Sequence, residues 1–109
     1  MNGEGTAVPD IDILPEQWAV VRDILHRRVP QYEVWAFGSR ARKNAKPYSD
    51  LDLAIITDVP LPLDIGAALR DELSESDLPW KVDIVDWAST DDVFRDVIRR
   101  GKVIVQRRR

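Results

Sequence analysis

Three aspartates interrupt apolar segments of this chain, and their carboxylates could hold a metal ion. Asp50 and Asp52 flank Leu51 at the start of one apolar run, and Asp83 lies inside another. Side chains two residues apart on a strand leave the same face, about 6–7 Å apart along the backbone. Two carboxylates that close repel each other unless a cation lies between them. Hard cations such as Mg²⁺ bind oxygen ligands, usually a few carboxylates plus substrate phosphates, so the pair suggests a magnesium site.

A structural role also accounts for the pair taken alone: Ser49 and Asp50 would cap a turn, and Asp52 would be a surface residue at a strand edge. Asp83 favours the metal site, because aspartate is disfavoured inside a strand and a buried polar group needs compensation. If the two strands are neighbours, Asp83 completes a cluster of three carboxylates. Asp86 interrupts the same run, but it faces the other way and ends the strand, where capping is easier, so we prefer Asp83.

A second group of residues is suited to binding phosphate. Gly38 and Ser39 follow a predicted strand and precede a predicted helical turn, so unpaired backbone N–H groups would point outward. Glycine lets a phosphate approach the backbone, and the Ser39 hydroxyl can add a hydrogen bond. The cations Arg40, Arg42, Lys43 and Lys46 follow. Each cation taken singly is better explained as part of a solvated loop that balances the nearby aspartates, and it is the combination of Gly-Ser, basic turn and D-x-D that favours phosphate binding.

The amino-acid composition limits the kinds of catalytic and metal-binding chemistry that the chain can perform. The chain has 109 residues, no cysteine and a single histidine, His26, so thiolate chemistry is excluded and acid-base or metal chemistry must come mainly from carboxylates. The net charge of −3 argues against nucleic-acid binding by the whole surface. No apolar run approaches the roughly 18 residues of a membrane span, and no signal peptide is recognisable, so we expect a cytoplasmic protein.

The elements that would position these residues follow from periodicity and punctuation. We expect an α/β or α+β domain with a small mixed sheet packed against helices, in the order αβ(α)βαβαβ. The predicted elements are a helix over 15–28, a strand over 32–37, a helical turn after Gly38, a strand over 51–57, a helix over 63–75, a strand over 80–87, a helix capped by Ser89 or Thr90 with an apolar face of Val93, Val97 and Ile98, and a strand over 102–106.

We further expect a loose leader over residues 1–14, one domain over 15–106 and a basic, solvated tail over 107–109. Four tryptophans are predicted to be core residues or, where exposed, anchors for a partner protein: Trp18, Trp35, Trp80 and Trp87.

The segment FGSRARKNAKPYSDLDLAII fits the pattern G-S-x10-D-x-D, with ten residues from Arg40 to Ser49. It resembles the nucleotidyltransferase superfamily that includes DNA polymerase beta, and in particular its small stand-alone branch, the minimal nucleotidyltransferase (MNT) domain. KVDIVDW is similar to a later strand of that branch. The resemblance covers nearly the whole chain from Trp18 to Val105. It departs at Lys43, where the branch often has glycine.

This resemblance implies a nucleotidyltransferase fold and an enzyme that uses ATP. Asp50 and Asp52 would bind two Mg²⁺ ions that carry the nucleotide, and Asp83 would ligate the second ion and help to activate the incoming hydroxyl. Gly38 and Ser39 would hold the β- and γ-phosphates, with Arg40 and Arg42 beside them.

Many short members of this family are antitoxins that pair with a HEPN-domain RNase toxin and transfer AMP from ATP to one of its tyrosines. The resemblance therefore implies a protein adenylyltransferase with a HEPN-domain partner and no direct nucleic-acid ligand. Two alternatives stay open: a binding module that masks a partner without catalysis, and a transferase that modifies a small molecule.

Overall fold

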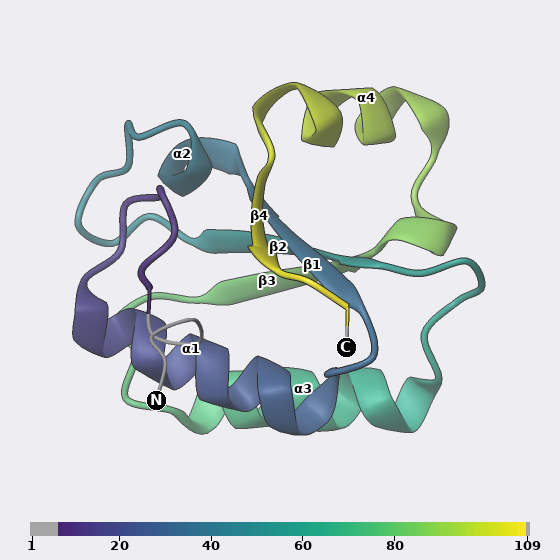
Figure 1. Ribbon diagram of the computed structural model, residues 1–109, viewed down its shortest axis with the longest axis horizontal. Coiled ribbons are helices and arrows are strands. Elements are labelled where there is room, and N and C mark those ends of the chain that lie inside the picture. Colours follow the sequence, from purple (N-terminus) through teal and green to yellow (C-terminus); the bar gives the residue numbers. More distant parts are fainter. Residues whose placement is uncertain (1–6, 109) are drawn as a thin grey trace.

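A computed structural model describes residues 7–108 and contains the elements expected from the sequence, in the expected order (Figure 1). They are α1 (Pro15–Arg28), β1 (Glu33–Phe37), α2 (Gly38–Ala41), β2 (Leu51–Ile56), α3 (Leu63–Glu75), β3 (Val82–Asp86), a 3₁₀ turn η1 (Trp87–Ser89), α4 (Asp92–Gly101) and β4 (Val103–Gln106). The added feature is η1, which continues directly from β3.

The four strands form one mixed sheet in the order β3-β2-β1-β4. β1 is antiparallel to β2 and to β4, whereas β2 and β3 are parallel. Parallel neighbours need a crossover connection, and α3 supplies it. The predicted mixed sheet is therefore confirmed, and the two strands that carry the aspartates are neighbours.

Helices cover both faces of the sheet (Figure 1). α1 and α3 lie on one face, over the main core, to which β2 contributes the fully buried Leu51, Leu53 and Ile55. α4 lies over the other face, where a smaller cluster contains Trp35, Phe37, Ala54 and Ile98. Because side chains alternate along a strand, Asp52 and Ala54 lie on the α4 side of β2.

The expected N-cap of α4 is wrong. Its N-cap is Asp91, whose carboxylate accepts a hydrogen bond from the Phe94 N–H at 2.8 Å, and not Ser89 or Thr90. Ser89 belongs to η1 and Thr90 is the C-cap of that turn, so α4 starts later than expected. Its predicted apolar face is also only partly buried: Ile98 is fully buried, but Val93 and Val97 are 77% and 46% exposed.

The expectation of a loose leader over residues 1–14 needs correction for its later part. Ile11 is buried in the main core, and the Asp12 N–H donates to the carbonyl of Arg40 at 2.9 Å. The Asp12 carboxylate also accepts a hydrogen bond from the Ala45 N–H at 3.0 Å. Residues 1–6 lie outside the described residues. At the other end Arg107 and Arg108 are exposed, and residue 109 is likewise not described.

Three of the four tryptophans are core residues and not exposed anchors: Trp18, Trp35 and Trp80 are at least 91% buried. Trp87 is half-buried and packs edge-on against Trp35, with ring centroids 5.1 Å apart. Within residues 7–108, no helix combines the length and the apolar character that crossing a membrane would require.

Candidate active site

The sheet register brings two of the predicted carboxylates together. Asp52 on β2 lies directly opposite Asp83 on the parallel strand β3, and neighbouring strands are about 4.8 Å apart. Asp50 comes immediately before β2, and the following residue, Leu51, donates its N–H to the Lys81 carbonyl at 2.9 Å. The start of β2 is therefore held against the start of β3, with the Asp52 and Asp83 side chains on the face that α4 partly covers.

Electrostatics at Asp52 reflect this crowding. The pKa of Asp52 is raised to about 6, mainly by burial and then by the charges of Asp83 and Asp50, against a lowering by Arg42. Burial and the two neighbouring carboxylates thus disfavour the ionised form of Asp52, which a bound cation would favour; Asp83 has the Lys81 ammonium 4.0 Å away.

Gly38 allows the Asp52 carboxylate to lie against the end of β1. Its φ of 78° is in the left-handed region, which glycine tolerates at little cost. A Cβ atom at this position would lie 2.3 Å from Asp52 Oδ2, so any other residue would displace the carboxylate. Ser39, the next residue of α2, is half-buried. The sequence-predicted Gly38–Ser39 turn and Asp52 therefore belong to one constellation.

Arg40 departs from its predicted role. Its side chain is 5% exposed, and its guanidinium donates to the carbonyls of Ser49, Asp12 and Pro47 at 2.9, 2.7 and 3.2 Å. The guanidinium also stacks 4.3 Å from the centroid of the Trp80 ring. The expectation that Arg40 binds phosphate is therefore corrected: these contacts fix the loop that ends at Asp50. Arg42 is exposed and acts on the charge of Asp52.

Lys43, where the chain departs from the family pattern, has a left-handed backbone with a φ of 65°. This conformation explains why glycine is usual at the position. The Lys43 ammonium pairs with the exposed Asp10 carboxylate at 2.7 Å, so it faces the N-terminal segment.

Asp86, the rejected alternative to Asp83, has the capping role that its place at the strand end suggested. Its carboxylate accepts hydrogen bonds from the Thr57 hydroxyl, from the N–H groups of Leu61 and Ala88 at 2.6 and 3.2 Å, and from the Ser89 hydroxyl at 3.3 Å. Burial alone would raise the pKa of Asp86, but these hydrogen bonds together lower it.

The donor set suits a hard cation. Asp50, Asp52 and Asp83 supply oxygen ligands only, and their mutual repulsion at Asp52 would be relieved by a bound ion. Within residues 7–108, no three carboxylate or imidazole side chains are close enough as they stand to hold one ion. The expected cluster of three carboxylates is therefore not assembled in the described part of the chain, although the register sets Asp52 opposite Asp83.

The sequence analysis did not identify the aromatic residues that border the site on one side. Phe37 lies directly opposite Asp52 across the β1–β2 pair, and the ring of Phe94 on α4 packs edge-on against Phe37 with centroids 5.7 Å apart. Phe94, Phe37, Asp52 and Asp83 therefore form a row across the sheet face. The alternation of β1 could have identified Phe37, but nothing local pointed to Phe94.

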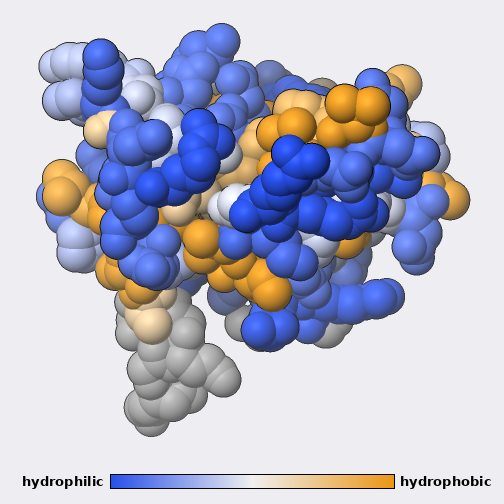
Figure 2. All heavy atoms as spheres, turned by 90° about the horizontal axis from the view of Figure 1, so that it is seen from above, coloured by the Kyte–Doolittle hydropathy of each residue, from blue (hydrophilic) through white to orange (hydrophobic). Residues whose placement is uncertain are grey.

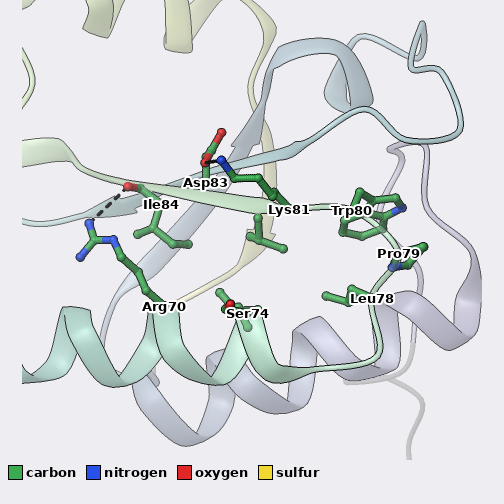
Figure 3. A pocket seen from close by; sticks show the side chains of 10 residues that line it. Arg70, Ser74, Leu78, Pro79, Trp80, Lys81, Asp83 and Ile84 are labelled. Atoms are coloured by element: carbon green, nitrogen blue, oxygen red, sulfur yellow. Dashed lines mark hydrogen bonds and ion pairs between the residues drawn. The ribbon is translucent and has the colours of Figure 1, made fainter.

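A groove of about 520 Å³ runs along the outer edge of β3 (Figure 3). It is lined by Arg70 and Ser74 of α3, by Trp80 and by residues of β3 that include Asp83 but neither Asp50 nor Asp52. Arg70 reaches across it to donate to the Ile84 carbonyl at 3.3 Å. The side chains of Asp83 and Lys81 point away from Arg70 and Ser74 (Figure 3). The groove thus borders the carboxylate site without containing it.

Comparisons with known proteins agree with this geometry. Residues 21–109 match the family model described as Polymerase beta, Nucleotidyltransferase. The chain is 50% identical over 101 residues to a probable protein adenylyltransferase MntA of Haemophilus influenzae, an alignment that covers 93% of this chain and 89% of the relative.

Two solved structures share the fold. A crystal structure of a toxin-antitoxin with AMP-PNP has a TM-score of 0.67 at 23% identity and covers 80% of this chain and 70% of its own. A complex of a tri-AMPylated Shewanella oneidensis HEPN toxin with an MNT antitoxin has a TM-score of 0.60 at 22% identity and covers 80% and 66%. The fold, the motif spacing and the family match agree, and the chain belongs to the polymerase beta nucleotidyltransferase family.

Proposed function

We propose that this chain is a magnesium-dependent protein adenylyltransferase that transfers AMP from ATP to a tyrosine of a HEPN-domain toxin and so neutralises it, in the cytoplasm. The observation that carries the proposal is the packing of the Asp52 carboxylate between Gly38 and Asp83, which joins the two halves of the G-S-x10-D-x-D motif. The identity to the Haemophilus influenzae adenylyltransferase supports the reaction, and the toxin complexes of the structural neighbours support the partner.

The roles of the residues follow from their positions. Asp50, Asp52 and Asp83 would hold Mg²⁺, which when bound stabilises the attacking and leaving oxygens of an in-line displacement at the α-phosphate. Gly38 and Ser39 would hold the β- and γ-phosphates, with the exposed Arg42 as a nearby cation. Asp83 lies on the edge strand β3, where an incoming tyrosine hydroxyl can reach it from solvent.

The chemical step balances as a nucleotidyl transfer. The tyrosine oxygen forms a bond to the α-phosphorus while the bond from that phosphorus to the bridging oxygen breaks. Diphosphate leaves with the bonding electrons. The hydroxyl proton passes to a carboxylate of the site, for which Asp83 is the candidate because its strand lies at the open edge of the sheet.

The test incubates the protein with labelled ATP, Mg²⁺ and, as the candidate partner, the product of the adjacent gene. We expect the mass of the partner to rise by whole AMP units with the wild-type chain and not with Asp50→Ala/Asp52→Ala. A matched control is Asp58→Ala/Asp77→Ala, which removes two exposed carboxylates from loops outside the site and should leave transfer intact.

Absence of any AMP on the partner with the wild-type chain would contradict the proposal. If the partner's RNase activity were nevertheless blocked in that case, the chain would act as a binding module that masks the toxin.

A further inference from the structure

The helix α4 carries an apolar surface that its own domain leaves open. Val93, Phe94 and Val97, here called the α4 stripe, are 77%, 38% and 46% exposed. They occupy adjacent positions on the helix surface, because residues three and four apart lie side by side. Figure 2, which views the molecule from the α4 side, shows apolar surface among strongly polar surface on this face. Contiguous exposed apolar surface with a polar rim commonly marks an interaction site.

The α4 stripe adjoins the proposed active site. Phe94 contacts Phe37, and Phe37 lies opposite Asp52 on the same face of the sheet, where paired side chains have Cβ atoms about 4.5–5.5 Å apart. At the other end of the helix, the Arg42 side chain lies 3.5 Å from where a Cβ of Gly101 would be. Both ends of α4 therefore lie near residues of the site, Phe94 through Phe37 and Gly101 through Arg42.

Charged residues surround the stripe without covering it. Arg95 donates to the Trp87 carbonyl at 2.8 Å, and Arg99 pairs with Asp96 at 2.9 Å. Both guanidinium groups also lie 5.1 Å from the Trp87 ring centroid. Through these contacts the side chains of Arg95 and Arg99 lie against η1 or along α4 itself. The stripe is therefore an apolar centre with a polar rim, as in protein interfaces.

The chemistry of the proposed reaction identifies what would cover this surface. A hydroxyl that attacks phosphorus must lie about 3–3.5 Å from it, and a tyrosine side chain is short compared with the width of a protein. An acceptor protein that places a tyrosine at Asp83 must therefore lay its own surface against the rim of the site. A small-molecule acceptor would need no such rim.

We propose that the α4 stripe is the docking surface for the acceptor protein, which packs apolar side chains on Val93, Phe94 and Val97 beside its modified tyrosine. This inference rests on the proposed function, because it names the surface through which the acceptor of that reaction is held.

The test compares two double variants of the full chain. Val93→Glu/Val97→Lys places charges on the stripe, keeps the net charge unchanged and adds a favourable i, i+4 pair to the helix. The matched control, Val59→Glu/Leu63→Lys, makes the same change in charge at two apolar residues that are 68% and 91% exposed between β2 and the start of α3. Thermal unfolding verifies that both variants fold.

We expect the stripe variant to weaken binding of the HEPN-domain partner at least about 10-fold by calorimetry, which corresponds to about 1.4 kcal/mol. In the transfer assay its KM for the partner should rise far more than its kcat falls, whereas its KM for ATP and all constants of the control should not change.

Three outcomes would overturn the inference. Unchanged partner affinity in the stripe variant would show that the acceptor binds elsewhere. A raised KM for ATP at unchanged partner affinity would assign the stripe to the nucleotide, and loss of a dimer of the chain alone, again with unchanged partner affinity, would assign it to self-association. If the wild-type chain binds the partner through the stripe but transfers no AMP, the proposed function fails and the docking surface stands.

Discussion

At the scale of single residues, the candidate site depends on the absence of a side chain at Gly38 and on the hydrogen bonds that the Arg40 guanidinium donates. Gly38 leaves the space in which the Asp52 carboxylate lies. Arg40 joins the segments that contain Asp12, Pro47 and Ser49 through three carbonyls, and Ser49 precedes Asp50 directly. Neither residue needs to touch substrate to affect the reaction, since both set the position of a carboxylate.

Replacing Gly38 by alanine should abolish most of the activity. The left-handed φ should cost about 1–2 kcal/mol of folding free energy, and the new Cβ must push Asp52 Oδ2 from its place. Because a misplacement of about 1 Å can cost about 100-fold in rate, we expect at least that loss in AMP transfer. Gly66→Ala is the control: its Cβ would meet the flexible Arg70 side chain at 3.0 Å, so stability should change by less than about 1 kcal/mol. Equal activity of the two variants would contradict the role of Gly38.

Replacing Arg40 by glutamine should affect both stability and metal dependence. Buried carbonyls would lose their donors, at a cost of about 1–3 kcal/mol, which denaturant titration measures. We expect the Mg²⁺ concentration for half-maximal transfer to rise by about 10-fold, because the loop before Asp50 is released. The control is Arg27→Gln, which removes a cation that is 56% exposed and paired with Glu72 on the surface. A loss of stability with an unchanged Mg²⁺ requirement would show that Arg40 is structural without positioning Asp50.

At the scale of elements, the connection between α2 and β2 is shaped by backbone conformation as much as by contacts. Lys43 ends the helical turn in a left-handed conformation, and the Ser49 hydroxyl accepts a hydrogen bond from the Lys46 N–H at 2.9 Å before β2 begins. This loop reverses the chain so that β2 returns antiparallel to β1. The ten residues between Ser39 and Asp50 thus form the loop that connects the Gly38–Ser39 half of the site to the carboxylate half.

Lys43→Gly should raise the free energy of unfolding by about 0.5–1 kcal/mol. Relief of the left-handed strain, about 1–2 kcal/mol, exceeds the added chain entropy of glycine in the unfolded state, about 0.5–1 kcal/mol. The lost ion pair with Asp10 is exposed and contributes little. Lys46→Gly is the comparison, because it adds the same chain entropy at an exposed loop residue without a left-handed φ, and it should lower stability. Chemical denaturation measures the free energy of unfolding of both variants. A lower value for Lys43→Gly than for the wild type would contradict the strain argument.

At the scale of the whole molecule, Asp86 joins the parallel half of the sheet to the connections that follow it. Its carboxylate is bonded to Thr57 after β2, to Leu61 before α3 and to Ala88 in η1. One ionised side chain therefore anchors three chain segments at the end of the sheet opposite the candidate site. Such a group makes the stability of the fold depend on pH.

The sign of that dependence follows from the lowered pKa of Asp86. The stabilisation is present above the ordinary value of 3.8 and is lost as the pH falls through the lower pKa of the folded state. Asp86→Asn should lower the free energy of unfolding at pH 7 by about 1–3 kcal/mol, and the difference from the wild type should shrink as the pH falls below about 3.8. Urea titrations at pH 7, 4 and 3 measure this. A difference that stays constant across that range would contradict the role of the ionised carboxylate.

The local features of this protein were predictable from its sequence. Periodicity and Pro/Gly punctuation predicted the α-helices and strands but not the 3₁₀ turn η1, because these signals depend on neighbours along the chain. Alternation along the strand separated Asp83 from Val82 and Ile84, and the end position of Asp86 indicated a cap. The motif spacing suggested that Gly38, Ser39, Asp50 and Asp52 act together, and family membership is confirmed.

Only the tertiary structure decided what depends on contacts between distant segments. The register that sets Asp52 opposite Asp83, the burial of Arg40 among carbonyls and the open α4 stripe each require knowing which surfaces meet. A cationic side chain in a loop has the same local sequence whether it faces phosphate or stacks on a tryptophan, and an amphipathic helix has the same period whether its stripe is covered or not. Local pattern therefore specifies elements and their faces, whereas packing determines which of those faces remain available for function.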